Sequence, residues 1–318
     1  MRTLGGYMLF LAAMGLCAGF GARAQDLAPR AYLITPTGSN AIILTYSHFS
    51  GGLLFDGAVP ITGATAKIHM PIFSYYHTLN CFGRTANITF IVPYGVGDFN
   101  GTVLEAPRHA YRSGLLDSYI RFSVNLKGGP AMNLQQFSKW KQKRLLGASL
   151  KVQMPTGQYD PTRLLNWGNN RWAFKPELGY SESWGHWVLD TYGAVWFFTT
   201  NPEFFSRNQF VPGVQKQTQE PVGAFEIHLS YDIKPRLWLS VDGNFWFGGK
   251  TSLNGVQNPV TEQRSSRVGA TASIPISKHQ SVKFSYSNGA YISFGGNYQN
   301  ISLAWQYSWV GWPHRHAQ

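Results

Sequence analysis

Apolar and polar side chains alternate residue by residue along much of this chain, and this alternation constrains its fold most. In residues 220–234, EPVGAFEIHLSYDIK, one face carries Phe225 and Ile227, and the other carries Glu226 and His228. A period of two indicates an extended strand with two chemically different faces. Similar segments lie at residues 40–48, 85–94, 115–126, 145–154, 171–181, 237–247, 267–276, 281–287 and 300–309, with less regular ones near 64–78 and 187–200. We therefore predict about twelve strands.

The links between these segments alternate in length. Long links that alternate with tight turns are typical of outer-membrane barrels, in which the tight turns face the periplasm. The glycine-rich residues 94–101, YGVGDFNG, are predicted to form an outer-loop turn. One link, residues 127–143, is too long for a tight turn and has room for a small periplasmic helix. Short links are expected near 79–84, 184–186, 234–236 and 277–280, and longer ones near 51–62, 95–112, 156–170, 200–220, 248–265 and 287–296.

The composition indicates which solvent the apolar faces meet. Charged residues are only 13% of the chain, about half the usual share for a soluble globular protein. A soluble double sheet would also alternate, but it gives no reason for links of alternating length. We therefore predict an all-β fold, a transmembrane antiparallel up-and-down β-barrel with its apolar faces toward lipid. Aromatic residues near strand ends are expected to form interfacial girdles; they are Tyr94, Trp172, Trp184, Trp187, Trp238 and Trp309.

The N-terminus has the pattern of a secretory signal peptide. Arg2 precedes an apolar stretch that ends near Phe20, and Ala24 completes an A-x-A cleavage site. Cleavage near Ala24 assigns residues 1–24 to the signal peptide and residues 25–318 to the barrel. Export of a barrel of this kind places it in the outer membrane of a Gram-negative cell.

The two cysteines offer no covalent stabilisation. Cys17 lies within the signal peptide and follows Leu16, whereas a lipoprotein signal has a small residue there. Cys81 is then the only cysteine left, so no intrachain disulfide is expected. Beyond the N-terminus no apolar run approaches the roughly 20 residues that a membrane helix requires.

The formal net charge of +12 is spread along the chain, with one local run at residues 139–144, KWKQKR. Nucleic-acid binding would favour basic residues clustered on one element, so no nucleic-acid partner is expected. A basic rim that faces anionic lipid head groups fits the scatter better. The expected partners are outer-membrane lipids and lipopolysaccharide, a small-molecule solute and the barrel-assembly machinery.

The polar faces of the strands supply the candidate functional residues, because they line the lumen when lipid lies outside. Twelve strands lie between the roughly 8 that pack shut and the 16 to 18 that leave an open channel. Charges in such a lumen would either create a transverse field at a constriction or fill the barrel with ion pairs, and both readings stay open. The candidates are Asp117, Arg121, Lys151, Lys175, Glu177, Asp190, Glu226, His228, Asp232, Asp242, Arg267 and Lys283.

A lipid hydrolase is the enzymatic alternative. His228 and Ser230 have the spacing of a barrel hydrolase, and Ser287 to Gly289 contain another part of such a site. The full His-x-Ser-Asn-Gly sequence is never assembled, and His228 and Ser230 face the lumen rather than lipid. We therefore predict no catalytic residue, and no metal or cofactor site.

Residues 151–181 read KVQMPTGQYDPTRLLNWGNNRWAFKPELGYS. A strand that ends in Pro-Thr-Gly-x-Tyr-Asp, followed by Leu-x-Asn-x-Gly-x-Asn-x-Trp, resembles the outer-membrane family "putative MetA-pathway of phenol degradation". The resemblance implies a barrel that admits small, often aromatic, molecules, and it carries no catalytic residues. We favour a structural loop over direct ligand contact, since glycine permits turns and asparagine can bond a loop to itself. The motif residues are Pro155, Gly157, Tyr159, Asn166, Gly168, Asn170 and Trp172.

Two classes of function follow from these patterns. The first is a channel for passive uptake of small, aromatic or hydrophobic molecules through a narrow, charged lumen. The second is a closed barrel with a structural or adhesive role or, with less support, a lipid hydrolase. The substrate and the oligomeric state do not follow from the sequence.

Overall fold

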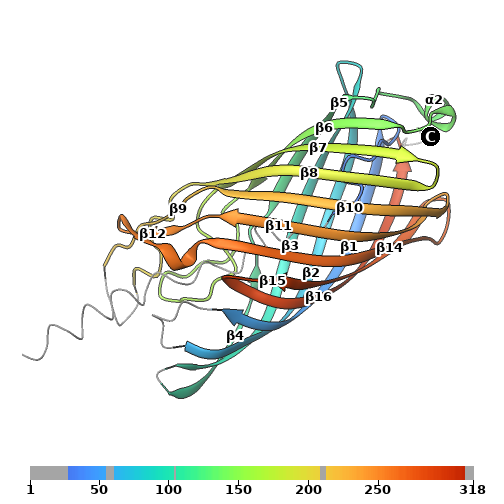
Figure 1. Cartoon of the computed structure of the whole chain (residues 1–318). Coiled ribbons are helices and arrows are strands. Elements are labelled where there is room, and N and C mark those ends of the chain that lie inside the picture. Colours follow the sequence, from blue (N-terminus) through green and yellow to red (C-terminus); the bar gives the residue numbers. More distant parts are fainter. Residues whose placement is uncertain (1–27, 55–60, 104, 208–212, 312–318) are drawn as a thin grey trace, which may run out of the picture.

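A computed structural model describes residues 28–54, 61–103, 105–207 and 213–311 (Figure 1). The predicted signal peptide and its cleavage site near Ala24 lie outside these residues. The main sheet contains β1 (Ser39–Leu54), β2 (Ile61–Cys81), β3 (Arg84–Val103), β4 (Ala106–Leu115), β5 (Tyr119–Lys127), β6 (Arg144–Gln153), β7 (Ala173–Trp184), β8 (Trp187–Phe198), β10 (Val222–Lys234), β11 (Leu237–Gly248), β14 (Gln263–Pro275), β15 (Gln280–Tyr291) and β16 (Gly295–Val310).

These strands form a closed antiparallel barrel, as predicted. β1 pairs with β16, from Ser39 opposite Val310 to Leu54 opposite Gly295, and this pairing closes the sheet. β4 and β5 both pair with β3 and together occupy one position in the wall, which gives a 12-strand barrel with one interrupted strand. A closed barrel satisfies every backbone group within the wall, as a membrane requires. Among the described residues, no helix has the length and apolar character to cross a membrane.

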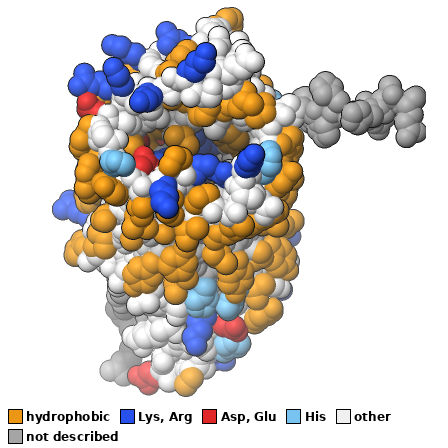
Figure 2. Space-filling model, turned by 90° about the vertical axis from the view of Figure 1, so that its right-hand side faces the viewer, with side chains coloured by type: hydrophobic (Ala, Val, Ile, Leu, Met, Phe, Trp, Pro, Cys, Tyr) orange, Lys and Arg blue, Asp and Glu red, His pale blue; other side chains and the backbone are white. Residues whose placement is uncertain are grey.

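The apolar faces of the strands point outward. On β10 the side chains of Phe225 and Ile227 are 46% and 44% exposed, whereas those of Glu226 and His228 are buried inside the barrel. The same contrast holds around the wall, where Leu44, Phe122 and Leu178 are exposed. Figure 2 shows hydrophobic side chains as a broad band on the face in view. Such a band is stable against acyl chains, so the barrel spans a membrane.

The ends of the barrel follow the predicted alternation of links at most positions. Tight turns join β2 to β3, β7 to β8 and β10 to β11. The link after β5 is the long exception, and it contains the predicted small helix, α2 (Leu134–Lys139), capped by Asn133. At the other end, the long links carry the short elements β9 (Gln217–Gln219), β12 (Thr251–Leu253), β13 (Val256–Asn258) and a 3-10 turn, Pro259–Thr261.

Three sequence predictions about this wall are wrong. The longer link expected near 287–296 is short, because β15 runs to Tyr291 and β16 begins at Gly295. Residues 95–112 form no long loop, because β3 continues through the glycine-rich residues 94–101 and pairs with β4. The glycines make room for side chains: a Cβ on Gly95 would lie 2.8 Å from Leu116 and 3.0 Å from the Trp167 ring. Trp238 belongs to no girdle. It faces the lumen and is 7% exposed, since it shares its parity on β11 with Asp242.

Candidate functional site

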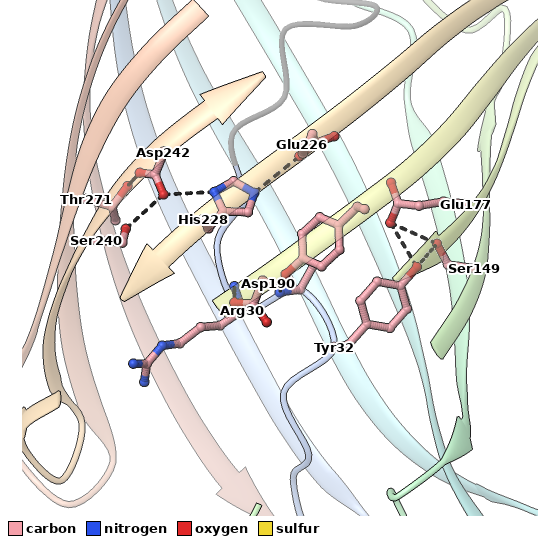
Figure 3. A network of polar contacts seen from close by, with 12 residues as sticks. Arg30, Tyr32, Ser149, Glu177, Asp190, Glu226, His228, Ser240, Asp242 and Thr271 are labelled. Carbon is pink, nitrogen blue, oxygen red and sulfur yellow. Dashed lines mark hydrogen bonds and ion pairs between the residues drawn. The ribbon is translucent and has the colours of Figure 1, made fainter. Parts of the chain in front are cut away.

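The segment before β1, residues 28–38, runs inside the lumen rather than outside the wall (Figure 3). The guanidinium of Arg30 pairs with Asp232 at 2.8 Å, and its backbone N–H donates to Asp190. The next backbone N–H, that of Ala31, donates to the hydroxyl of Tyr192 at 3.0 Å. The segment is therefore held by inward side chains of β8 and β10, and it narrows the passage.

Tyr32 anchors this segment in a seat made by two glycines. Gly147 on β6 and Gly179 on β7 are direct partners in the sheet. A Cβ at either position would come within 2.2 and 2.1 Å of the Tyr32 ring, so only glycine leaves room for the ring. The Tyr32 hydroxyl donates to Glu177 at 2.9 Å and lies 3.1 Å from Ser149. Shape and hydrogen bonding together fix the ring.

A network of charges crosses the inner faces of β7, β10 and β11. The ammonium of Lys175 lies 2.9 Å from Glu177 and 3.0 Å from Glu226. The His228 ring lies 3.6 Å from Glu226 through Nε2 and 2.8 Å from Asp242 through Nδ1 (Figure 3). All five side chains are buried. Buried charges of this kind require partners, and each acid here has a cation or a histidine beside it.

Further contacts extend this network at both ends. Arg121 on β5 approaches Glu177 at 3.4 Å and donates to the carbonyl of Ala31. Asp242 accepts hydrogen bonds from Ser240 at 2.9 Å and from Thr271 at 2.8 Å. We call the inward side chains of β6, β7, β8, β10 and β11 the filled wall, since ion pairs, hydrogen bonds and the N-terminal segment occupy this side of the lumen.

The opposite side of the lumen is more open. Several inward side chains of β1, β15 and β16 are short and half-buried, among them Thr45, Ser285 and Ala304, and the longer Lys283 is half-buried as well. We call the inward side chains of β15, β16 and β1 the open wall. Figure 2 shows the end that carries α2, where the barrel is hollowed and charged side chains are visible inside.

A row of hydroxyl groups joins the two walls along directly paired positions of the sheet. Strand pairing places Ser230 opposite Ser240, Ser240 opposite Thr271, and Thr271 opposite Ser285. The row continues through Ser302 to Ser47, whose hydroxyls lie 2.8 Å apart. Six neighbouring strands thus carry short polar side chains along one line of sheet partners. Ser285 and Ser302 are half-buried, whereas the other four side chains are buried.

Apolar clusters line the outer half of the lumen. One contains Ala173, Trp196, Val222, Trp246 and Ile292, with Tyr119 and Phe198 packed against it. Cations lie over these rings: Lys151 is 4.9 Å from the centroid of Tyr119 and 5.9 Å from that of Trp196. On the other side, Ile68, Met70, Phe99, Leu116 and Trp167 form a second cluster. Most of these side chains are buried, so the two clusters pack the interior of the barrel at its outer end.

Asp117 holds the loop of the sequence motif against the barrel wall. It lies in the gap between β4 and β5 and is 2% exposed. Its carboxylate accepts hydrogen bonds from the backbone N–H groups of Gly157 and Asn169, at 3.0 and 2.9 Å, and from the side chains of Gln153 and Asn169. Gly157 and Gly168 touch through their backbones, with no space for a Cβ. The glycines of the motif therefore serve close packing.

The other motif residues bond the loop to itself and to its neighbour. Asn166 accepts from the N–H of Asp160 and donates to the carbonyls of Asp160 and Arg163. Asn170 and Tyr159 both bond the side chain of Asn201. Hydrogen bonds from Thr162 hold the pKa of Asp160 below its usual value. Trp172 stacks on Phe174 and is largely exposed, and Pro155 is exposed at the end of β6.

The sequence predicted a charged lumen but did not predict that residues 28–38 lie inside it. Lys175, Glu177, Glu226, His228 and Asp242 lie together in the network. Lys151 is the direct sheet partner of Lys175, and Arg267 and Lys283 lie on β14 and β15. Arg267 on β14 donates to Ser287 and to the carbonyl of Tyr298. Arg30 and Tyr32 were missed because they precede the strands. Glycines at inward positions of β6 and β7 were the available signal.

His228 and Ser230 are both buried inside the barrel, away from lipid. Across the residues that the structure describes, no three histidine, cysteine, aspartate or glutamate side chains are arranged to hold a metal ion.

Comparisons with known proteins agree with this architecture. The family model "Putative MetA-pathway of phenol degradation" matches residues 56–290. The crystal structure of the COG4313 outer membrane channel from Pseudomonas putida F1 is similar, with a TM-score of 0.72 and 17% identity over 89% of this chain and 100% of that one. The beta domain of the Bordetella autotransporter BrkA has a TM-score of 0.50 and 10% identity over 86% and 100%. No curated protein sequence matches. The two structural likenesses show the fold, an outer-membrane barrel.

Proposed function

Because the chain belongs to the family described as "Putative MetA-pathway of phenol degradation", we propose that it is an outer-membrane channel for passive uptake of small hydrophobic or aromatic molecules. The barrel domain comprises residues 25–318, after removal of residues 1–24 as a signal peptide. The similar structure from Pseudomonas putida is an outer membrane channel by name, which supports the same class of function.

The observation that carries this proposal is the uneven filling of the lumen. The filled wall has no space for a solute, whereas side chains of the open wall, such as Thr45 and Ser285, stay half-exposed inside the barrel. Partly buried aromatic side chains at the outer end, Phe49 and Phe198 among them, suit an apolar solute at entry. A narrow passage of this kind admits small molecules by diffusion and needs no energy source.

Flux measurements on the purified, folded chain test the proposal. We expect liposomes that contain it to take up phenol-sized aromatic solutes faster than protein-free liposomes, and planar bilayers to show a small conductance. Tyr32→Ala, which empties the glycine seat, should raise both rates, whereas Tyr111→Ala, at an exposed position on β4, should leave them unchanged. Absence of both flux and conductance in the wild type and in Tyr32→Ala would contradict the proposal.

A closed barrel with a structural or adhesive role is the second candidate. The observation in its favour is the N-terminal segment, which is bonded to Asp190, Tyr192 and Glu177 in the middle of the lumen. If this segment seals the passage permanently, no variant of Tyr32 will conduct. The lipid hydrolase receives no such support, because His228 and Ser230 are enclosed by the barrel.

The partners proposed for the exterior follow from its surface. Lipids contact the apolar band, and lipopolysaccharide is proposed at the outer rim, where Lys67, His48 and His69 lie beyond the exposed Tyr46. Figure 2 shows histidine and basic side chains below the hydrophobic band in this view. For the barrel-assembly machinery, the recognition element we propose is the end of β16, where Tyr307 and Trp309 face outward.

A further inference from the structure

Lys283 is the one candidate cation that projects from the open wall. It lies on β15, opposite Ser273 of β14 and Ala304 of β16, and the same row continues to Thr45 of β1. These three neighbours are small, so none of them covers the side chain of Lys283. Lys283 is half-buried within the lumen, beside the passage that the N-terminal segment leaves.

Within the described part of the chain, Lys283 makes no hydrogen bond or ion pair. Its ammonium lies 5.7 Å from the centroid of the Trp238 ring. The acid that acts on it most strongly is Asp242, but both oxygens of Asp242 are already engaged by His228, Ser240 and Thr271. A cation in a confined lumen without a counter-charge attracts an anion, since Coulomb interactions there are weakly screened.

Arg30 adds positive charge at the same place. Its guanidinium lies over the same Trp238 ring at 4.5 Å and influences Lys283 electrostatically. One nitrogen of Arg30, Nη1, pairs with Asp232, while Nε and Nη2 are buried and have no partner within the described residues. The inner part of the passage thus combines two cations with donors that remain unused.

We propose that Lys283, with Arg30 beside it, binds the anionic group of a permeating small organic anion, such as an aromatic carboxylate, and gives the passage a preference for such anions over neutral molecules of the same size. The inference deepens the proposed function and rests on it for the route, because the anion reaches Lys283 along the open wall. The hydroxyls of Ser285 and Thr45 lie on neighbouring positions of this wall and offer hydrogen bonds to a carboxylate.

Uptake of benzoate and of benzamide into liposomes tests this preference, because the two probes differ in charge and little in size. We expect the wild-type ratio of benzoate to benzamide flux to fall roughly tenfold in Lys283→Gln, which corresponds to about 1.4 kcal/mol. Lys283→Arg should keep most of the preference, since the charge remains. Lys250→Gln removes a lysine that pairs with Glu262 at the outer end, and it should leave the ratio unchanged.

A binding measurement separates the inference from the channel proposal. Saturation-transfer NMR of benzoate with the detergent-solubilised protein should show a signal that Lys283→Gln abolishes and Lys283→Arg retains. If this signal appears but no solute crosses the membrane, the anion site stands and the channel proposal fails. If flux occurs but its benzoate preference is the same in Lys283→Gln, or if the NMR signal does not depend on Lys283, the inference is overturned.

Discussion

The filled wall and the open wall belong to one sheet, yet they differ in side-chain packing and in the pairing of their charges. On the filled wall every charge near Lys175 and His228 has a partner, and Arg30, Ala31 and Tyr32 pack against it. On the open wall many inward side chains are short, and Lys283 makes no ion pair with the described residues. The difference indicates that the filled wall contributes mainly to the stability of the barrel and the open wall mainly to the passage of solutes. Substitutions should therefore affect folding on one side and selectivity on the other.

The largest loss of stability is expected from Lys175→Met on the filled wall. The substitution leaves Glu177 and Glu226 buried without their shared cation, and breaking a buried pair typically costs about 3–5 kcal/mol. Unfolding in denaturant, followed by tryptophan fluorescence, measures the change in the free energy of unfolding. Lys283→Met on the open wall is the matched control, with an expected change below about 1 kcal/mol. Equal losses in the two variants would remove the distinction between the walls.

Asp117→Ala should have the next largest effect, because four hydrogen-bond donors lose one carboxylate. We expect a loss of about 2–3 kcal/mol and faster proteolysis within residues 154–172. Asp117→Asn keeps one acceptor oxygen and should lie between the wild type and Asp117→Ala. Unchanged protease resistance in Asp117→Ala would show that Asp117 does not hold the loop.

Gly147→Ala, on β6 at the edge of the filled wall, tests whether the position of Tyr32 limits conductance. The added methyl group would overlap the Tyr32 ring, and overpacking of this kind costs about 1–3 kcal/mol. We expect Tyr32 to leave its seat and the single-channel conductance to rise. Gly193→Ala on β8 is the control, since a Cβ there meets nothing within 4 Å. A conductance that stays at the wild-type value in Gly147→Ala would mean that Tyr32 does not limit the passage.

The smallest effect is expected at the outer mouth, away from both walls, from Thr162→Ala. Its hydroxyl bonds Asp160 at 2.6 Å and is the main cause of the lowered pKa of that carboxyl. The pKa of Asp160 should therefore rise toward its ordinary value, as an NMR titration would show. A lowered pKa contributes stability above the unfolded-state pKa, and this is lost as the pH falls through the folded-state pKa. Asp160 is partly exposed, so the free energy of unfolding should change by less than about 0.5 kcal/mol.

The parts of this fold that depend on a period of two could be predicted from the sequence. The inward direction of Glu226 and His228 and the outward direction of Phe225 follow from alternation and from the choice of lipid as the outer solvent. Trp238 was misplaced because its residue type was given more weight than its parity on β11. Residues 94–101 were misread because glycine is typical of turns, whereas Gly95 and Gly97 here make room for the Trp167 ring.

The contacts within the lumen could not be predicted in the same way. The pair of Lys175 and Glu226 joins β7 to β10 across β8, so it depends on the register of three strands and on the lengths of their side chains. The place of Tyr32 depends on two glycines more than a hundred residues away in the chain. Alternation gives the direction of a side chain, but it does not give its partner.

The N-terminal segment remains covalently attached to β1, and this has a consequence for how it competes with a solute. Gly38 is fixed to the wall by a hydrogen bond to the carbonyl of Thr78. Tyr32 lies six residues before it, so even with its ring detached the Cα of Tyr32 stays within about 20 Å of Gly38. A tether of this length keeps the effective concentration of the ring near its seat on the order of millimolar or higher. The competition between the Tyr32 ring and a solute therefore does not depend on the protein concentration. Every solute that needs the space of the ring binds with an apparent affinity lowered by the same factor.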